Sequence, residues 1–131
     1  MLSIPTSSVT CAFLWLTTDS PAFSEKAKGV FQDTENVIYL SSVSIWEMLV
    51  KHQLGKLPLP AEPDIFIQQQ CELHFIEFLA LDEKAVFHLS RLPNHHRDPF
   101  DKMLVCQAIA YDLTILTSDK LISQYPVVTA W

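Results

Sequence analysis

The chain has 131 residues, enough for one domain, whereas two independent cores would each be marginal. Its 49% hydrophobic and 18% charged residues, with only two glycines, exclude a disordered or fibrous protein. The net charge of −6 argues against a simple nucleic-acid-binding module but is compatible with a basic protein partner, or with a nuclease whose divalent ions reverse the local charge.

The first clear elements along the chain are a strand followed by a helix. Val37 to Leu40 is short, apolar and partly β-branched, which predicts a buried strand. Residues 41–56 then show apolar side chains at helical spacing, and Ser44 with Glu47 matches the S-x-x-E capping pattern. Gly55, followed by two prolines, ends this predicted helix.

The same alternation continues to the end of the chain. We predict helices over 64–73, 82–92, 100–111 and 120–124, a polar loop over 93–99, and strands over 75–79, 113–117 and 127–130. Strands that alternate with helices predict an α/β fold, here a three-layer α/β/α domain over residues 1–131 with a mostly parallel central sheet. In such sheets ligands bind at the carboxyl ends of the strands, near a topological switch point.

The cysteines and large aromatic residues have structural interpretations. Cys11, Cys71 and Cys106 are odd in number and lack zinc-site or redox-motif spacing, so we expect reduced thiols, with Cys106 in the core. We assign four aromatic residues to packing rather than to base stacking: Trp15, Trp46, Phe13 and Phe66. No run reaches the roughly 18 apolar residues of a membrane helix, and no secretory signal is evident, so we expect a cytoplasmic protein.

Three carboxylates lie where this architecture would gather them. Asp119 follows a predicted strand, and Glu47 lies in the first turns of the helix after another. Asp101 begins an apolar helix face, where an unpaired acid is costly. Hard oxygen ligands without Cys or His favour Mg²⁺ or Mn²⁺, which can activate water for in-line displacement at phosphate. If the three converge, phosphodiester hydrolysis is the reaction they suit.

Each acid also has a structural explanation. Asp119 could cap the short helix that follows it. Glu47 could complete a capping box with Ser44 and pair with Lys51 one turn later. Asp101 could complement the helix dipole. The residues alone leave both interpretations open.

Two longer motifs resemble those of PIN-domain proteins. Residues 41–60, SSVSIWEMLVKHQLGKLPLP, resemble the S-x-x-S-x-W-E helix and the G-K-L-x-L-P segment of that family. Residues 94–110, NHHRDPFDKMLVCQAIA, resemble its H-H-R-D-P-F-D-R-L-L-I-A-Q-A segment. Residues 113–125 resemble its last acidic strand end, and residues 11–16, together with a helix at Ser24, resemble its opening helices. The similarity spans nearly the whole chain.

The resemblance implies a VapC-type endoribonuclease toxin of a bacterial toxin–antitoxin pair. It implies an RNA substrate, Mg²⁺ or Mn²⁺, an antitoxin protein as partner, and a homodimer. Carried over by position, Glu47, Asp101 and Asp119 would be catalytic metal ligands, and Asp98 of the D-P-F-D motif would be a supporting acid. The neighbouring loop could contact substrate phosphate or could be a solvated polar loop; its residues are His95, His96 and Arg97.

The first acid of the family pattern is missing. Family members open with a short apolar strand ending in Asp-Thr, whereas here Thr10 follows Val9. The expected strand is replaced by residues 2–8, where Pro5 is poorly suited to a central strand. The protein could be a weakened or inactive nuclease that still binds its partner. Alternatively, Asp98, Thr10 or a water could complete the site, or the opening residues could reflect a shifted reading frame near the start of the chain. We expect impaired catalysis, because magnesium sites depend on ligand count and geometry.

Overall fold

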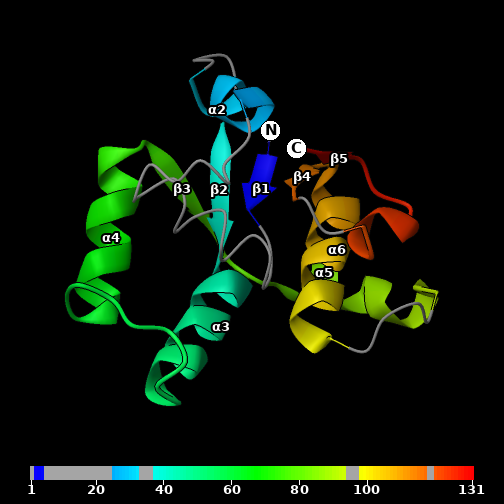
Figure 1. Cartoon of the computed structure of the whole chain (residues 1–131). Coiled ribbons are helices and arrows are strands. Elements are labelled where there is room, and N and C mark those ends of the chain that lie inside the picture. Colours follow the sequence, from blue (N-terminus) through cyan, green and yellow to red (C-terminus); the bar gives the residue numbers. More distant parts are fainter. Residues whose placement is uncertain (1, 5–24, 33–36, 94–97, 118–119) are drawn as a thin grey trace.

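A computed structural model of the chain describes residues 2–4, 25–32, 37–93, 98–117 and 120–131 (Figure 1). Its strands are β1 (Leu2–Ile4), β2 (Ile38–Ser41), β3 (Ile76–Leu79), β4 (Thr114–Leu116) and β5 (Thr129–Ala130). Its helices are α2 (Glu25–Gln32), α3 (Ser42–Gln53), α4 (Pro63–Leu73), α5 (Glu83–Val86) and α6 (Pro99–Tyr111), with 3₁₀ segments η1 (Phe87–Arg91) and η2 (Ile122–Gln124). In the part of the chain that is described, no helix is long and apolar enough to cross a membrane.

The five strands form one parallel sheet in the order β3-β2-β1-β4-β5. The central strand β1 pairs with β2 on one side and with β4 on the other, so Leu2 lies opposite both Ile38 and Thr114. The strand order reverses between β1 and β4, which makes the carboxyl ends of these two strands the topological switch point of this sheet. This topology confirms the predicted α/β fold.

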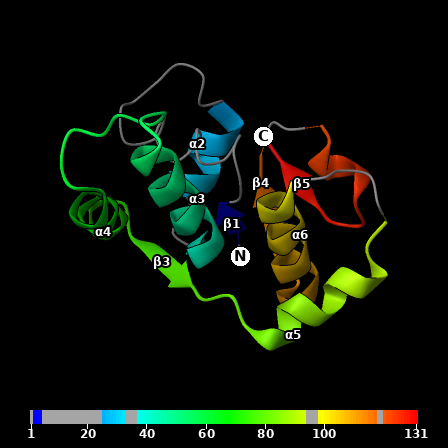
Figure 2. The same cartoon turned by 90° about the horizontal axis from the view of Figure 1, so that it is seen from below.

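Two hydrophobic cores cover the two faces of the sheet, as expected when side chains alternate along each strand. One core joins Ile38, Leu40 and Ile76 to α3 and α4, through Met48, Phe66, Ile67 and Cys71. The other joins Leu113 and Ile115 to α6 and the C-terminal segment, through Val105, Ala108, Ile122 and Tyr125. The strands therefore lie between α4 and α6 in both views (Figures 1 and 2), which is the predicted three-layer arrangement.

The expectation that the opening strand is lost was wrong. Leu2–Ile4 forms the central strand of the sheet, whereas Pro5 lies outside the described residues. The sequence did not reveal this strand because three residues are too few for an alternating pattern to be recognised. Val9 and Thr10 lie outside the described residues.

The predicted helix boundaries hold to within a few residues, with three differences, one of which is that the predicted helix over 120–124 is the 3₁₀ segment Ile122–Gln124. Helix α3 is capped by Ser41, whose hydroxyl accepts a hydrogen bond from the Val43 amide at 3.0 Å. The predicted Ser44–Glu47 capping box is therefore wrong, because Ser44 is a buried residue inside the helix. The predicted helix over 82–92 is divided into the four-residue α5, capped by Asp82, and the 3₁₀ segment η1.

Candidate active site

Two contacts fix α3 and α6 side by side. At one end, the Ser41 hydroxyl donates to the side-chain oxygen of Gln107, and the Gln107 amide nitrogen donates to the Ala80 carbonyl at 3.3 Å. Further along α3, the Trp46 ring meets the Phe100 ring edge-on, with centroids 4.8 Å apart and planes at 75°. The start of α3 thus lies beside the end of α6, and the middle of α3 lies beside the start of α6. The two helices are therefore antiparallel neighbours (Figure 2).

This arrangement places two of the predicted metal ligands at the same level. Glu47 follows Trp46 by one residue, and Asp101 follows Phe100 by one residue, on the facing helices. Both carboxylates are buried, with 2% of Glu47 and 1% of Asp101 exposed. Burying a carboxylate costs free energy unless a cation or hydrogen-bond donors compensate it. The two helices therefore bury two carboxylates, although burying even one costs free energy.

Lys51 supplies a cation to one of these acids. Its ammonium lies 3.1 Å from Oε2 of Glu47, one helical turn away, and about a third of its side chain is exposed. The predicted Glu47–Lys51 pair is thus confirmed. Because the pair is partly solvated, its net contribution to folding is modest. The contact also shows that Oε2 of Glu47 is placed to accept a positively charged partner.

Asp98 positions the turn that carries Asp101. It is the N-cap of α6, and its Oδ1 accepts hydrogen bonds from the amides of Phe100 at 2.9 Å and Asp101 at 3.2 Å. Pro99 occupies the first helical position, where its missing N–H is not needed. Asp98 therefore holds the backbone of Asp101 in place, a geometry compatible with the supporting role predicted for it.

Tyr125 is a neighbour of Asp101 that the sequence reasoning missed. It follows η2 and is only 3% exposed. Burial raises the pKa of its phenol, and the negative charge of Asp101 raises it further, because an ionised phenol beside a carboxylate is unfavourable. No local sequence signal marks this residue, since the fold alone brings the C-terminal segment to the start of α6.

The remaining predicted site residues lie outside the described part of the chain: Asp119, Thr10, His95, His96 and Arg97. The described residues on either side of positions 118 and 119 are Thr117 and Lys120. Thr117 is buried, and its amide donates to the Ala130 carbonyl at 3.0 Å beyond the end of β4. Among the described residues, no three His, Cys, Asp or Glu side chains gather into a metal-binding group. The structure therefore buries Glu47 and Asp101 on two neighbouring helices, and their joint role with Asp119 stays a prediction.

The donor chemistry of this pair fits a hard divalent ion. Glu47 and Asp101 offer only carboxylate oxygens, which are the ligands that Mg²⁺ and Mn²⁺ prefer. The buried cysteine on α6, Cys106, belongs to the core, as predicted. The pair is thus compatible with the predicted ion.

An apolar pocket of about 650 Å³ adjoins this site between α3, η1 and α6. Its lining residues are Trp46, Leu81, Leu89, Leu92, Pro99, Lys102 and Met103. Trp46 is 57% exposed and packs edge-on against Phe100, so it is a packing residue at the surface rather than in the core. Phe66 is a core residue, as predicted. Trp15 and Phe13 lie outside the described residues.

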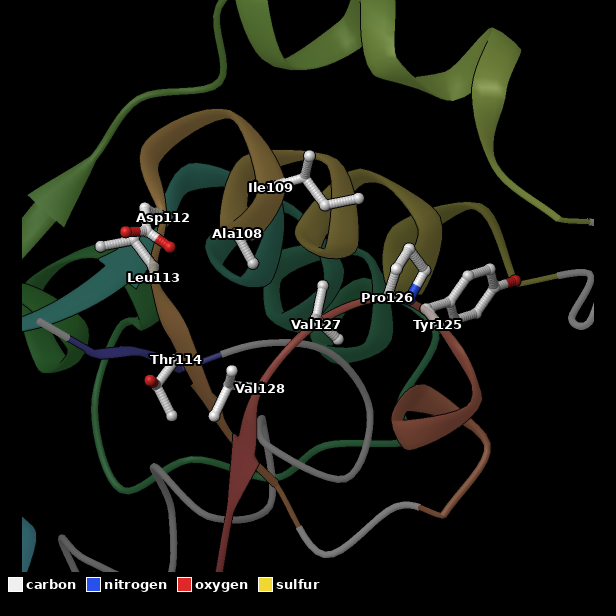
Figure 3. Close-up of a pocket in the computed structure, with 9 residues that line it drawn as sticks. All are labelled: Ala108, Ile109, Asp112, Leu113, Thr114, Tyr125, Pro126, Val127 and Val128. Carbon is white, nitrogen blue, oxygen red and sulfur yellow. The ribbon is translucent and has the colours of Figure 1, made fainter.

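A second pocket, of about 400 Å³, lies at the opposite end of α6 (Figure 3). It is formed by Ala108 and Ile109 near the end of the helix, by Asp112 after it, and by Val127 and Val128 before β5. Figure 3 shows the Tyr125 ring pointing away from the valines. The α6 residues that line this pocket are near the end of the helix, whereas Asp101 is on the first turn. Tyr125 is the lining residue that also neighbours Asp101.

Comparison with known proteins identifies the family. The PIN-domain profile matches residues 9–128. The chain belongs to the PIN-domain family. A search of the curated proteins found no match. A crystal structure described as VapBC2 from Rickettsia felis bound to a DNA fragment from their promoter shares the fold of this PIN domain, with a TM-score of 0.67 and 15% identity over 99% of this chain and 98% of that one.

Proposed function

We propose that this PIN-domain protein is a Mg²⁺- or Mn²⁺-dependent endoribonuclease of the VapC toxin type. The observation that carries the proposal is the burial of Glu47 and Asp101 at one level of two facing helices in a PIN domain. Two buried acids on neighbouring helices favour a shared cation over separate structural roles. A cytoplasmic location accompanies the proposal.

Glu47, Asp101 and Asp119 would hold the ion, which would supply an activated water and neutralise charge on the phosphate. Asp98 keeps the first turn of α6 rigid, so that the Asp101 carboxylate stays in position. Lys51 holds the carboxylate of Glu47 from the solvent side. The basic residues 95–97 would contact the RNA backbone beside the site.

Val9 motivates a second candidate function, a non-catalytic PIN-domain protein that acts through antitoxin or other protein binding. A first acid in the family pattern would add charge and a ligand that this chain lacks at that position. We therefore expect weak cleavage by the chain as it stands. An antitoxin partner and a homodimer belong to either function.

RNA cleavage separates the two functions. A fluorescent single-stranded RNA is incubated with the chain in Mn²⁺ or Mg²⁺, beside Asp101→Asn and Glu47→Gln. Asp64→Asn and Glu72→Gln are matched controls, because both change exposed acids on α4. Cleavage that is lost in the two site variants and kept in the two controls supports the nuclease.

Val9→Asp completes the experiment. Cleavage by Val9→Asp alone, lost again in Val9→Asp/Asp101→Asn, identifies a nuclease fold whose activity this chain has lost and supports the binding function. Cleavage that survives Asp101→Asn contradicts the proposed site. Calorimetric titration with Mn²⁺ gives an independent readout, since the proposal requires Asp101→Asn to weaken Mn²⁺ binding by at least about tenfold.

A further inference from the structure

The outer edge of the sheet at β3 is open and carries exposed apolar side chains. Among the described residues, β3 pairs with β2 alone and lies at the end of the strand order. Around it Leu73 is 65% exposed, Phe75 89% and Phe78 50%. An edge strand with unpaired main-chain groups and exposed apolar residues is a template for another strand.

Phe75 has a backbone conformation that favours glycine. Its φ is 56°, in the left-handed region, where a bulky side chain is disfavoured. The residue follows the end of α4, a position where glycine is the usual choice. Phe75 is therefore strained and also almost fully exposed, so neither the backbone nor burial explains an aromatic residue here.

The charged side chains of α4 and β3 have one sign. Residues 63–79 contain three acids and no lysine or arginine, and all three acids are exposed: Asp64, Glu72 and Glu77. Burial lowers the pKa of the one histidine in this range, His74, so it adds no positive charge at neutral pH. Glu77 lies on the edge strand itself, between Ile76 and Phe78.

We propose that the β3 edge surface, defined by Leu73, Phe75, Glu77 and Phe78, docks an extended segment of a partner protein in which lysine or arginine alternates with apolar residues. The segment adds a strand to β3, so main-chain hydrogen bonds hold it while the exposed aromatics take its apolar side chains. Its basic side chains meet Glu77. A second copy of this chain does not fit, because it would bring two acidic surfaces together.

This surface goes beyond the proposed nuclease and is tested without RNA or metal. The probe is a capped peptide of about nine residues that alternates Lys and Val, long enough to span a strand. It is titrated into the ¹⁵N-labelled full chain while amide spectra are recorded. We expect saturable shifts confined to residues 73–79 and their neighbours on β2, weakened at about 0.5 M salt because charge attraction is screened.

Two control peptides test the chemistry of docking. A Glu–Val peptide of the same length keeps the apolar residues but has the wrong charge. A Lys–Val peptide methylated on alternate backbone nitrogens keeps the charge but cannot pair along a strand edge. Equal binding of either control overturns the proposal, as does a Lys–Val peptide that leaves residues 73–79 unshifted or shifts the apolar pocket at Trp46 instead.

Variants of the full chain complete the test. Glu77→Lys and Phe78→Ser each weaken binding of the Lys–Val peptide by at least about fivefold. The first removes the negative charge, and the second removes an apolar contact. Matched controls lie elsewhere on the surface, namely Glu25→Lys on α2 and Phe87→Ser on η1, where the side chains are also exposed. Native amide spectra show that each variant is folded. Unchanged affinity in Glu77→Lys and Phe78→Ser overturns the proposal.

Discussion

We predict that the hydrogen bonds of the buried Gln107 side chain hold α3 in place against α6. Its side chain is fully buried, accepts from the Ser41 hydroxyl and donates to the Ala80 carbonyl. In Gln107→Leu, the buried Ser41 hydroxyl loses its acceptor and the part-buried Ala80 carbonyl loses its donor. An unsatisfied buried group costs about 1–3 kcal/mol, and the remaining bond from Val43 to Ser41 reduces the first cost. We expect a loss of about 2–4 kcal/mol in the free energy of unfolding.

Urea denaturation followed by circular dichroism measures this loss, and thermal melting should show a midpoint lower by roughly 6–15 °C. Gln68→Leu is the matched control, because it makes the same change at an exposed position on α4. The double variant Ser41→Ala/Gln107→Leu should lose less than the sum of the two single changes, because it removes donor and acceptor together. If Gln107→Leu is as stable as Gln68→Leu, the reasoning is refuted.

Three further predictions concern strain, pH and thiols. Phe75→Gly should raise the free energy of unfolding by about 0.5–1 kcal/mol in urea melts, because it relieves a left-handed φ, whereas the same change at Phe78 should lower it. The hydrogen bond from Tyr111, and then the hydrogen bond from the Ala85 amide, lower the pKa of Asp82 below its ordinary value of 3.8. Asp82 therefore stabilises the folded chain above pH 3.8, and this stabilisation is lost as the pH falls below that value. Tyr111→Phe should reduce the fall of the urea midpoint at acid pH. Burial raises the pKa of Cys71 to about 11 and also raises that of Cys106, so in Cys11→Ser a thiol reagent at pH 8 should react only as fast as the chain unfolds.

Periodicity and chain breakers were enough to predict most helices and strands. Helix α6 begins after Asp98-Pro99 and carries an apolar face, and α3 ends near Gly55, so each boundary has a local cause. The capping residue of α3 was misplaced because β2 passes directly into the helix at Ser41, without the loop that usually separates strand from cap. The break between α5 and η1 has no such local signal.

Contacts between distant residues were beyond the sequence. Ser41, the hydrogen-bond partner of Gln107, is 66 positions away in the sequence. The sequence alone therefore shows Gln107 only as a polar residue within an apolar helix. Tyr125 reaches Asp101 from the C-terminal segment for the same reason. Exposure also depends on tertiary packing, as Trp46 shows: its helical spacing suggested the core, but the ring rests edge-on against Phe100 at the surface.

The burial of the two acids weighs against their structural explanations. Asp101 could complement the dipole of α6 equally well from an exposed position, where its carboxylate would keep its hydration. Glu47 is not part of a capping box, and its pair with Lys51 would also form on a solvent-facing side of α3 without the cost of burial. Yet both side chains lie inside, at one level of two facing helices. The shared cation that we propose would account for that joint burial, whereas separate surface roles would not.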